Sequence, residues 1–280
     1  MPNDIIVHGI EWTAKELFVY PNEYIYWSIQ IVMYPYMTGL VAGAFVLSSL
    51  YHVFGLKQLK EIAQFSLVFS LALLPVAALP LLLHLQQPTR AMGPLLTPHF
   101  TSAIAAFGIV FTAYALIVLS EIWFVYRKYF VEQVHSLKNK PGLSNAMSRL
   151  VYQALTIGAY DVSDDAIRVD KKAATVLAAI GIPVACFLHG YAGFIFGSVK
   201  ANALWMSPLM PVIFIMSAVV SGIALCMLTY IVIREWQAFR SRRHGGMLEA
   251  KEIKGAEQDV IDTAARYLLG FLIAAISLEM

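Results

Sequence analysis

Apolar and polar residues in this chain follow one another in long blocks rather than in short periods. Five apolar blocks are each long enough to cross the hydrocarbon core of a membrane as a helix, which takes about 20 residues. A sixth block is cut off by the end of the chain. The blocks are 27–53, 63–83, 102–126, 173–197, 208–233 and 264–278. Since a bilayer leaves no backbone group to be satisfied by water, the pattern predicts an all-α, polytopic transmembrane helix bundle.

The composition supports a membrane protein. Hydrophobic residues make up 59% of the chain and charged residues only 14%, with a mean hydropathy of +0.67, whereas soluble domains carry about 25% charged residues. A net charge of +2 gives no indication of nucleic-acid binding. Cys186 and Cys226 both lie in apolar blocks and form no CxxC motif. The sequence therefore gives no support for disulfides, cysteine-ligated clusters or c-type haem.

Basic residues predict the orientation of the bundle. Nearly all lysines and arginines fall in the connections that follow the first, third and fifth blocks, and the remaining three are Lys15, Arg90 and Lys200. Connections rich in Lys and Arg stay in the cytoplasm. We therefore expect a protein of the prokaryotic cytoplasmic (inner) membrane. Its N-terminus and the connections before the third and fifth blocks would face the outside.

The blocks also suggest how the chain is organised. Residues 1–26 are expected to form a periplasmic N-terminal segment, 27–197 a first four-helix transmembrane bundle, and 198–280 the start of a second bundle. A cytoplasmic insertion, 129–172, interrupts the first bundle and mixes acidic with basic residues. It is either an amphipathic or helical segment on the membrane face or a solvated linker.

Small residues are spaced for close helix contact in two of the blocks. Gly39 and Gly43 form a GxxxG motif in the first block, and Gly193 and Gly197 form another in the fourth. Such motifs usually allow two helix backbones to approach closely. A backbone surface open to a flat ligand is the alternative.

Polar side chains gather at one depth, at the outer ends of the predicted helices. They are Asn22, Glu23, His84, Gln86, Gln87, Arg90, His99, Ser102, His189 and Tyr191. Converging polar groups between apolar walls are typical of a small-molecule pocket. A quinone suits such a pocket, because its carbonyls need hydrogen-bond donors, its tail needs lipid and its redox chemistry moves protons. Simple anchoring at the membrane interface is the alternative.

Helical geometry limits which of these groups can share a ligand. His189 and Tyr191 are two residues apart, about 200° around a regular helix, so only one of them is expected to face the site. His84 and His189 could instead be axial ligands of a b-type haem. A second haem would need another buried pair, and His52, at the inner end of the first block, has no obvious partner in the sequence.

Glu121 is the only acidic residue within the five full-length blocks. It lies six residues before Arg127, about 9 Å of helical rise from the inner edge of the membrane. Ionisable groups inside a membrane are costly, so they either reach the surface, pair with another group or serve a function. The sequence leaves two interpretations: pairing or snorkelling, and a place in a proton path.

Two stretches resemble the NrfD/PsrC family, the membrane subunits of polysulfide reductase and related quinone-linked respiratory complexes. One is similar to the family's connection between the second and third helices: HLQQPTRAMGPLLTPHFTSAIAAFG (84–108). The other is similar to a family segment with a PLW…PLLPVLF…SA…G pattern: HGYAGFIFGSVKANALWMSPLMPVIFIMSAVVSGIAL (189–225). Within the family, the likeness is nearest to the DsrP-type subunits of sulfur metabolism.

The resemblance implies a function. It implies a quinone-interacting subunit, not catalytic alone, that exchanges electrons and protons between the menaquinone or ubiquinone pool and a periplasmic iron–sulfur (ferredoxin-like) partner. It implies no haem or metal in this chain. By position, Tyr191 matches the family's quinone-site tyrosine, His84 takes the place of a loop aspartate, and Asn22 falls in a region that contacts the head group. The expected quinone-binding residues are His84, Tyr191, His189, Arg90, Asn22 and Gln87.

The sequence also departs from the family pattern. His84 stands where the family has an aspartate, and Gln87 stands where it has an arginine. Arg90, three residues further on, could take over the role of that arginine. Family members have eight or more helices, so the chain is expected to be incomplete. Two other functions stay open: a proton-conducting or transporter subunit that uses Glu121 and the histidines, and a purely structural membrane anchor.

Overall fold

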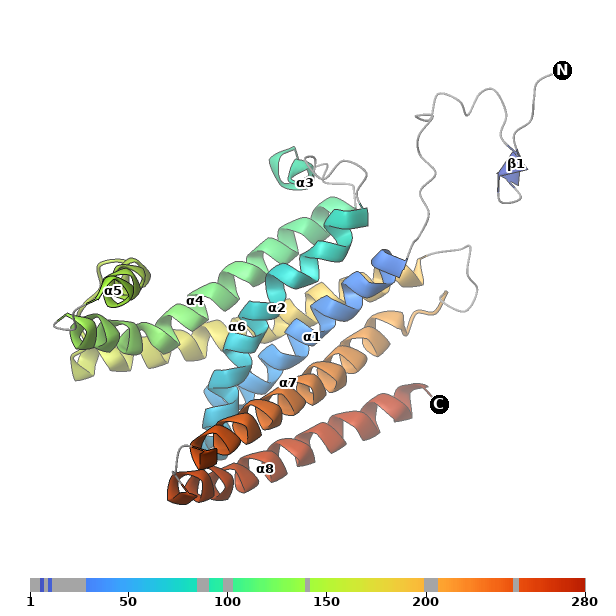
Figure 1. Cartoon of the computed structure of the whole chain (residues 1–280). Coiled ribbons are helices and arrows are strands. Elements are labelled where there is room, and N and C mark those ends of the chain that lie inside the picture. Colours follow the sequence, from blue (N-terminus) through green and yellow to red (C-terminus); the bar gives the residue numbers. More distant parts are fainter. Residues whose placement is uncertain are drawn as a thin grey trace.

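A computed structural model describes the protein over residues 6–7, 10–11, 29–84, 91–97, 103–138, 142–198, 206–243 and 247–279. The predictions at Asn22, Gln87 and Arg90 lie outside the described residues. Within the described ranges the structure is almost entirely helical (Figure 1). The exception is an antiparallel pair of two-residue strands, β1 (Ile6–Val7) and β2 (Ile10–Glu11).

Six long helices form the body of the molecule, and each contains a stretch long and apolar enough to span a membrane. They are α1 (Ile29–His52), α2 (Lys60–His84), α4 (Ala103–Leu137), α6 (Asp164–Gly197), α7 (Met210–Arg243) and α8 (Met247–Glu279). Three short helices lie in the connections: η2 (Lys57–Leu59), α3 (Gly93–Leu96) and α5 (Leu143–Thr156). The all-α prediction is therefore confirmed for the described part of the chain.

The long helices join two ends of the bundle (Figure 1). At one end α2 and α6 finish and α1, α4 and α7 begin; we call it the His84 end. At the opposite end lie the α1–α2 connection, α5 and the connection between α7 and α8; we call it the His52 end. The connections predicted to be cytoplasmic thus share one end of the bundle.

Four helices share a first core. α1 packs against α2 and α6, and α4 packs against the same two helices. All four contribute buried side chains to one cluster, among them Phe45 of α1, Leu67 of α2, Tyr114 of α4 and Leu188 of α6. Burial of such large side chains stabilises helix association through close packing, because lipid itself is as apolar as the core.

A second core lies on the other side of α1, where α7 packs against α1 and α8 packs against α7. Gly43 of α1 and Gly222 of α7 allow this contact, because a Cβ at Gly43 would overlap the Ala218 carbonyl oxygen and lie 2.8 Å from the Gly222 Cα. A Cβ at Gly193 would lie 2.7 Å from the Met210 carbonyl oxygen. The close helix contact predicted from the GxxxG motifs is confirmed at both places.

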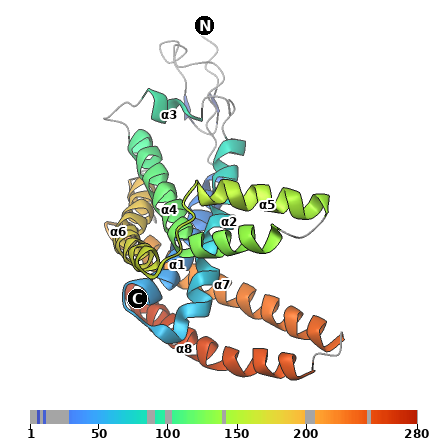
Figure 2. The same cartoon turned by 90° about the vertical axis from the view of Figure 1, so that its left-hand side faces the viewer.

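The 129–172 insertion is mostly helical. α4 runs past the apolar block to Leu137, α5 lies against α4, and α6 begins early, at Asp164 (Figure 2). The Ser163 side chain accepts a hydrogen bond from the Ala166 amide and caps α6, with Asp164 and Asp165 in its first turn. The Trp123 indole donates to the Leu155 carbonyl at 2.9 Å and ties α5 to α4.

Candidate functional site

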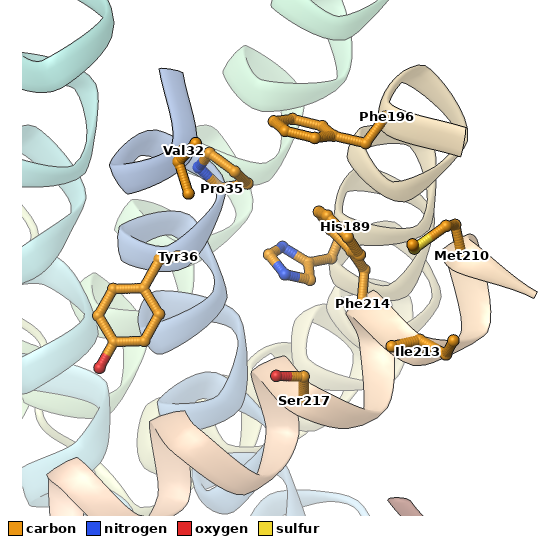
Figure 3. Close-up of a pocket in the computed structure, with 9 residues that line it drawn as sticks. All are labelled: Val32, Pro35, Tyr36, His189, Phe196, Met210, Ile213, Phe214 and Ser217. Carbon is orange, nitrogen blue, oxygen red and sulfur yellow. The ribbon is translucent and has the colours of Figure 1, made fainter. Parts of the chain in front are cut away.

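A pocket opens between α1, α6 and α7, in the half of the bundle toward the His84 end (Figure 3). Its volume is about 280 Å³. The wall is almost wholly apolar or aromatic. The residues lining it are Val32, Pro35 and Tyr36 of α1, His189 and Phe196 of α6, and Met210, Ile213, Phe214 and Ser217 of α7.

His189 supplies the buried polar group of this pocket. Only 5% of the residue is exposed, and its imidazole points into the space between α6 and α1 (Figure 3). The Phe214 ring lies 5.9 Å from the imidazole, centre to centre, and Phe196 lies 5.4 Å from Phe214. The Nδ1 atom has no hydrogen-bond partner among the described residues. A buried polar atom without a partner costs about 1–3 kcal/mol, so the site is prepared to bind a polar group.

Two glycines set the position of the imidazole. A Cβ at Gly39 of α1 would lie 2.9 Å from both Cε1 and Nε2 of His189, so the absent side chain makes room for the ring. On α6, the close approach at Gly193 brings the start of α7 against the helix and completes the far wall. The local sequence HGYAG therefore provides both the polar group and the helix contact that encloses it.

The pocket can hold a flat, mostly apolar ligand with a polar atom at its edge. Its volume lies near the lower limit of small-molecule pockets, about 300–1,000 Å³. Aromatic rings on two helices offer stacking surfaces, and one imidazole nitrogen offers a hydrogen bond. In the part of the chain that the structure describes, no three His, Cys, Asp or Glu side chains gather closely enough to hold a metal ion.

The two predicted groups of α6 face different ways, as the helix geometry requires. Tyr191 does not line the pocket; it packs against the first core and stacks with Phe187, with ring centres 5.7 Å apart. His84 is half-buried at the last residue of α2 and is likewise absent from the lining. The structure therefore does not bring His84, His189 and Tyr191 together around this pocket.

Several residues of interest had no signal in the sequence. The α7 wall of the pocket consists of ordinary apolar positions, and only the fold brings it to His189. Tyr34, on α1, has a buried hydroxyl with no partner in the described ranges, and its ring lies edge-on to Phe107 at 5.3 Å. A tyrosine near the start of a membrane helix is too common to be singled out from sequence.

A second buried ionisable site lies toward the His52 end. Glu121 is completely buried, and its Oε1 atom lies 3.5 Å from Nδ1 of His52. No partner for His52 was evident in the sequence, and the structure supplies one. Pairing with a neighbouring basic group, one of the two interpretations for Glu121, thus has a specific candidate.

In the part of the chain that the structure describes, six membrane-length helices, three of which line a pocket, indicate a multi-pass membrane protein. The family model described as "Polysulphide reductase, NrfD" matches residues 20–278. The chain therefore belongs to the NrfD family, as the two sequence stretches had indicated.

Two relatives extend this comparison. A selenate reductase subunit of Mesobacillus selenatarsenatis is 33% identical over 215 residues, which cover 75% of this chain and 49% of the relative. A putative dimethyl sulfoxide reductase membrane subunit of Halobacterium salinarum is 28% identical over 220 residues, 78% of this chain and 46% of the relative. The chain thus spans about half the length of the curated relatives it matches.

Proposed function

We propose that this protein is the quinone-interacting integral membrane subunit of a respiratory oxidoreductase complex. It would exchange electrons and protons between the menaquinone or ubiquinone pool and an iron–sulfur partner subunit in the periplasm. Family membership and two relatives named as reductase subunits support a place in such a complex. The substrate class that fits the family description best is an oxidised sulfur or related compound.

One observation supports the quinone assignment: beside an apolar pocket lies the buried Nδ1 of His189, which has no hydrogen-bond partner among the described residues. A protein that served only as a membrane anchor would need neither a buried imidazole nor a pocket beside it. Packing energy would be greater with an apolar side chain at this position, since burying an imidazole without a partner costs free energy. A ligand with a polar edge removes that cost when it binds.

The imidazole suits both redox forms of the ligand. A bound quinone supplies two-electron, two-proton chemistry. In the tautomer that carries a proton on Nδ1, His189 would donate a hydrogen bond to a carbonyl oxygen. In the other tautomer, the bare Nδ1 would accept a hydrogen bond, and a proton, from a hydroxyl. Phe196 and Phe214 would hold the ring and exclude water.

The remaining predicted quinone ligands stay part of the proposal. His84, with Asn22, Gln87 and Arg90, would contribute from the His84 end, where the partner subunit would dock. Tyr191, which does not line the pocket, would contact only a ligand that extends outside it. This end would face the periplasm, because the basic connections lie at the other. A ligand reaching from the pocket toward that end would bring electrons closest to the partner.

Quinol-dependent turnover of the complex, purified with its partner subunits, tests this proposal. Replacing His189 with Leu should lower turnover by about 10²-fold through loss of proton exchange and should weaken binding of a short-chain quinone. The matched control is His135→Leu, since His135 lies at the far end of α4 and bonds only the Val131 carbonyl in the described structure. Wild-type turnover in His189→Leu, with the complex intact, would support the anchor function instead.

A further inference from the structure

The Glu121–His52 site differs from an ordinary ion pair. Neither carboxylate oxygen of Glu121 has a hydrogen-bond partner among the described residues, although the side chain is 0% exposed. The nearest basic atom, Nδ1 of His52, is also within 3.1 Å of the Ser48 carbonyl oxygen and 3.2 Å of the Ser48 hydroxyl. Because a carbonyl can only accept, the contact with the Ser48 carbonyl favours the tautomer of His52 that carries its proton on Nδ1.

The other charged groups at the His52 end face elsewhere. Arg127 of α4 binds Asp170 of α6, and Glu61 of α2 binds Arg234 and the Tyr230 hydroxyl of α7. Other titratable side chains near His52 are Tyr51 of α1, whose ring lies 4.9 Å from that of His52, the exposed Lys57 of η2 and the exposed Lys60 of α2. Further cations on elements that pack against α4 are Arg149 of α5 and Arg168, Lys171 and Lys172 of α6. Among the described residues, no ion pair or hydrogen bond brings a permanent cation to Glu121.

We propose that Glu121 and His52 form a proton-uptake site that holds one exchangeable proton and serves the His52 end of the bundle. A lone ionised carboxylate in this position would be costly, so the carboxyl group keeps the proton while His52 is neutral. The His52 side chain is 9% exposed at the end of α1, next to the α1–α2 connection. Its Nε2, for which the described residues provide no hydrogen bond, would accept a proton from water there, and Nδ1 would pass its own to the carboxylate.

Each step conserves charge and needs no oxidant. When Glu121 releases its proton toward the pocket, its carboxylate is left charged. Nε2 of His52 then takes up a proton, and the imidazolium that forms pairs with the carboxylate. Transfer of the Nδ1 proton to Glu121 then restores two neutral groups, with the imidazole proton left on Nε2. Tautomer exchange, in which Nε2 releases its proton and Nδ1 takes one up, then restores the starting form of His52.

Polar groups continue from this site toward the pocket. Tyr114, two helical turns before Glu121 on α4, and Ser70 of α2 both donate to the Val41 carbonyl of α1. Val41 is two residues from Gly39, which contacts His189. A small void of about 10 Å³ borders His189 on this side, close to the space that one water needs, about 10–15 Å³. The two sites lie about 20 Å apart along α1, the rise of thirteen residues.

The test uses the complex with its partner subunits, reconstituted in liposomes, and compares Glu121→Gln with Glu132→Gln. Glu132 lies on the same helix but is exposed and pairs with Lys128, so its substitution should change nothing. The first readout is the infrared C=O band of a protonated carboxylic acid at neutral pH. The band should be present in the wild type and in Glu132→Gln and absent in Glu121→Gln.

The second readout is turnover with a short-chain quinol or quinone, together with the affinity for that probe. Glu121→Gln should lower turnover by about 10²-fold while leaving the affinity unchanged. His52→Asn should also slow turnover but keep the infrared band. A wild-type turnover rate in Glu121→Gln, or a wild type without the band, would overturn the proton site. The turnover readout rests on the proposed function, whereas the infrared readout does not. If the wild type failed to bind quinone, the proposed function would be refuted, and the infrared band would still test the proton site.

Discussion

Two buried carboxylates, Asp170 of α6 and Glu121 of α4, have opposite surroundings. Asp170 is fully engaged: Arg127 donates to it from Nε at 3.1 and 2.9 Å and from Nη2 at 2.6 Å. The same guanidinium also donates to the carbonyls of Ala159 and Asp161. Glu121, less than two turns earlier on the same helix as Arg127, has only His52 at 3.5 Å among the described residues.

The difference distinguishes buried polar groups that stabilise the fold from buried polar groups that can bind a ligand or exchange a proton. A bidentate, saturated pair such as Arg127–Asp170 fixes two helices and the α5–α6 connection in one arrangement and has no proton to exchange. An unsaturated group such as Glu121 or His189 contributes little to the fold but can bind or release something. Substitutions of groups of both kinds test this distinction, and they are given from the largest expected effect to the smallest.

Breaking the saturated pair should have the largest effect on stability. Asp170→Ala leaves the Arg127 guanidinium buried without its carboxylate, which should cost about 3–5 kcal/mol. Glu121→Gln removes no bond and should leave stability nearly unchanged. Thermal unfolding of the detergent-solubilised protein measures both. A larger loss in Glu121→Gln than in Asp170→Ala would reverse the distinction.

Gly43 and Gly39 offer the same contrast on one face of α1. Gly43→Ala would push a methyl group into the α7 backbone, which cannot move alone, so we expect a loss of about 1–3 kcal/mol. Unfolding at matched detergent concentration would show it. An unchanged midpoint would mean that α1 and α7 are not packed as closely as described.

Gly39→Ala should instead affect the pocket. Its methyl group would meet the end of the His189 ring, which can turn into the adjoining space. Quinone affinity should therefore fall by about fivefold, the equivalent of roughly 1 kcal/mol, with less loss of stability than in Gly43→Ala. Titration with a short-chain quinone measures the change. Unaltered affinity together with a large stability loss would place Gly39 with the packing glycines.

Asp161 should give the smallest effect. Hydrogen bonds from the Ser163 amide and hydroxyl hold the pKa of this exposed carboxyl below its ordinary value. A lowered pKa stabilises the folded state at pH values above the unfolded pKa, about 3.9, and the contribution disappears as pH falls through the folded pKa. Asp161→Ala should thus be slightly less stable than the wild type at pH 7 and equal to it at low pH. A difference that grows in acid would contradict this.

Much of the fold could be predicted from the sequence because lipid imposes a simple rule on length and composition. The six spans of the described residues and the close contacts at Gly43 and Gly193 follow from local patterns, whereas the sequence left the insertion open between a helical segment and a solvated linker. The C-terminal end of α4 and the start of α6 could not be predicted well, since both helices extend into charged sequence, where hydropathy no longer marks the helix.

The candidate site was harder to predict. The sequence singled out His189 and Tyr191 and predicted that only one of them would face the site, but it did not indicate which. The apolar α7 wall and the partnership of His52 with Glu121 depend on long-range packing and have no local signal. The family resemblance directed attention to Tyr191 and His84, whereas the described pocket is built around His189.

Photolabelling of the purified protein with an azido-quinone, followed by mass spectrometry of the labelled peptides, tests the central claim most directly. The pocket predicts labels on α1 near Tyr36 and on α6 or α7 near His189 and Met210, reduced by excess quinone and by His189→Leu. Labels confined to α2 or α8, or labelling that excess quinone does not reduce, would contradict a quinone site at His189.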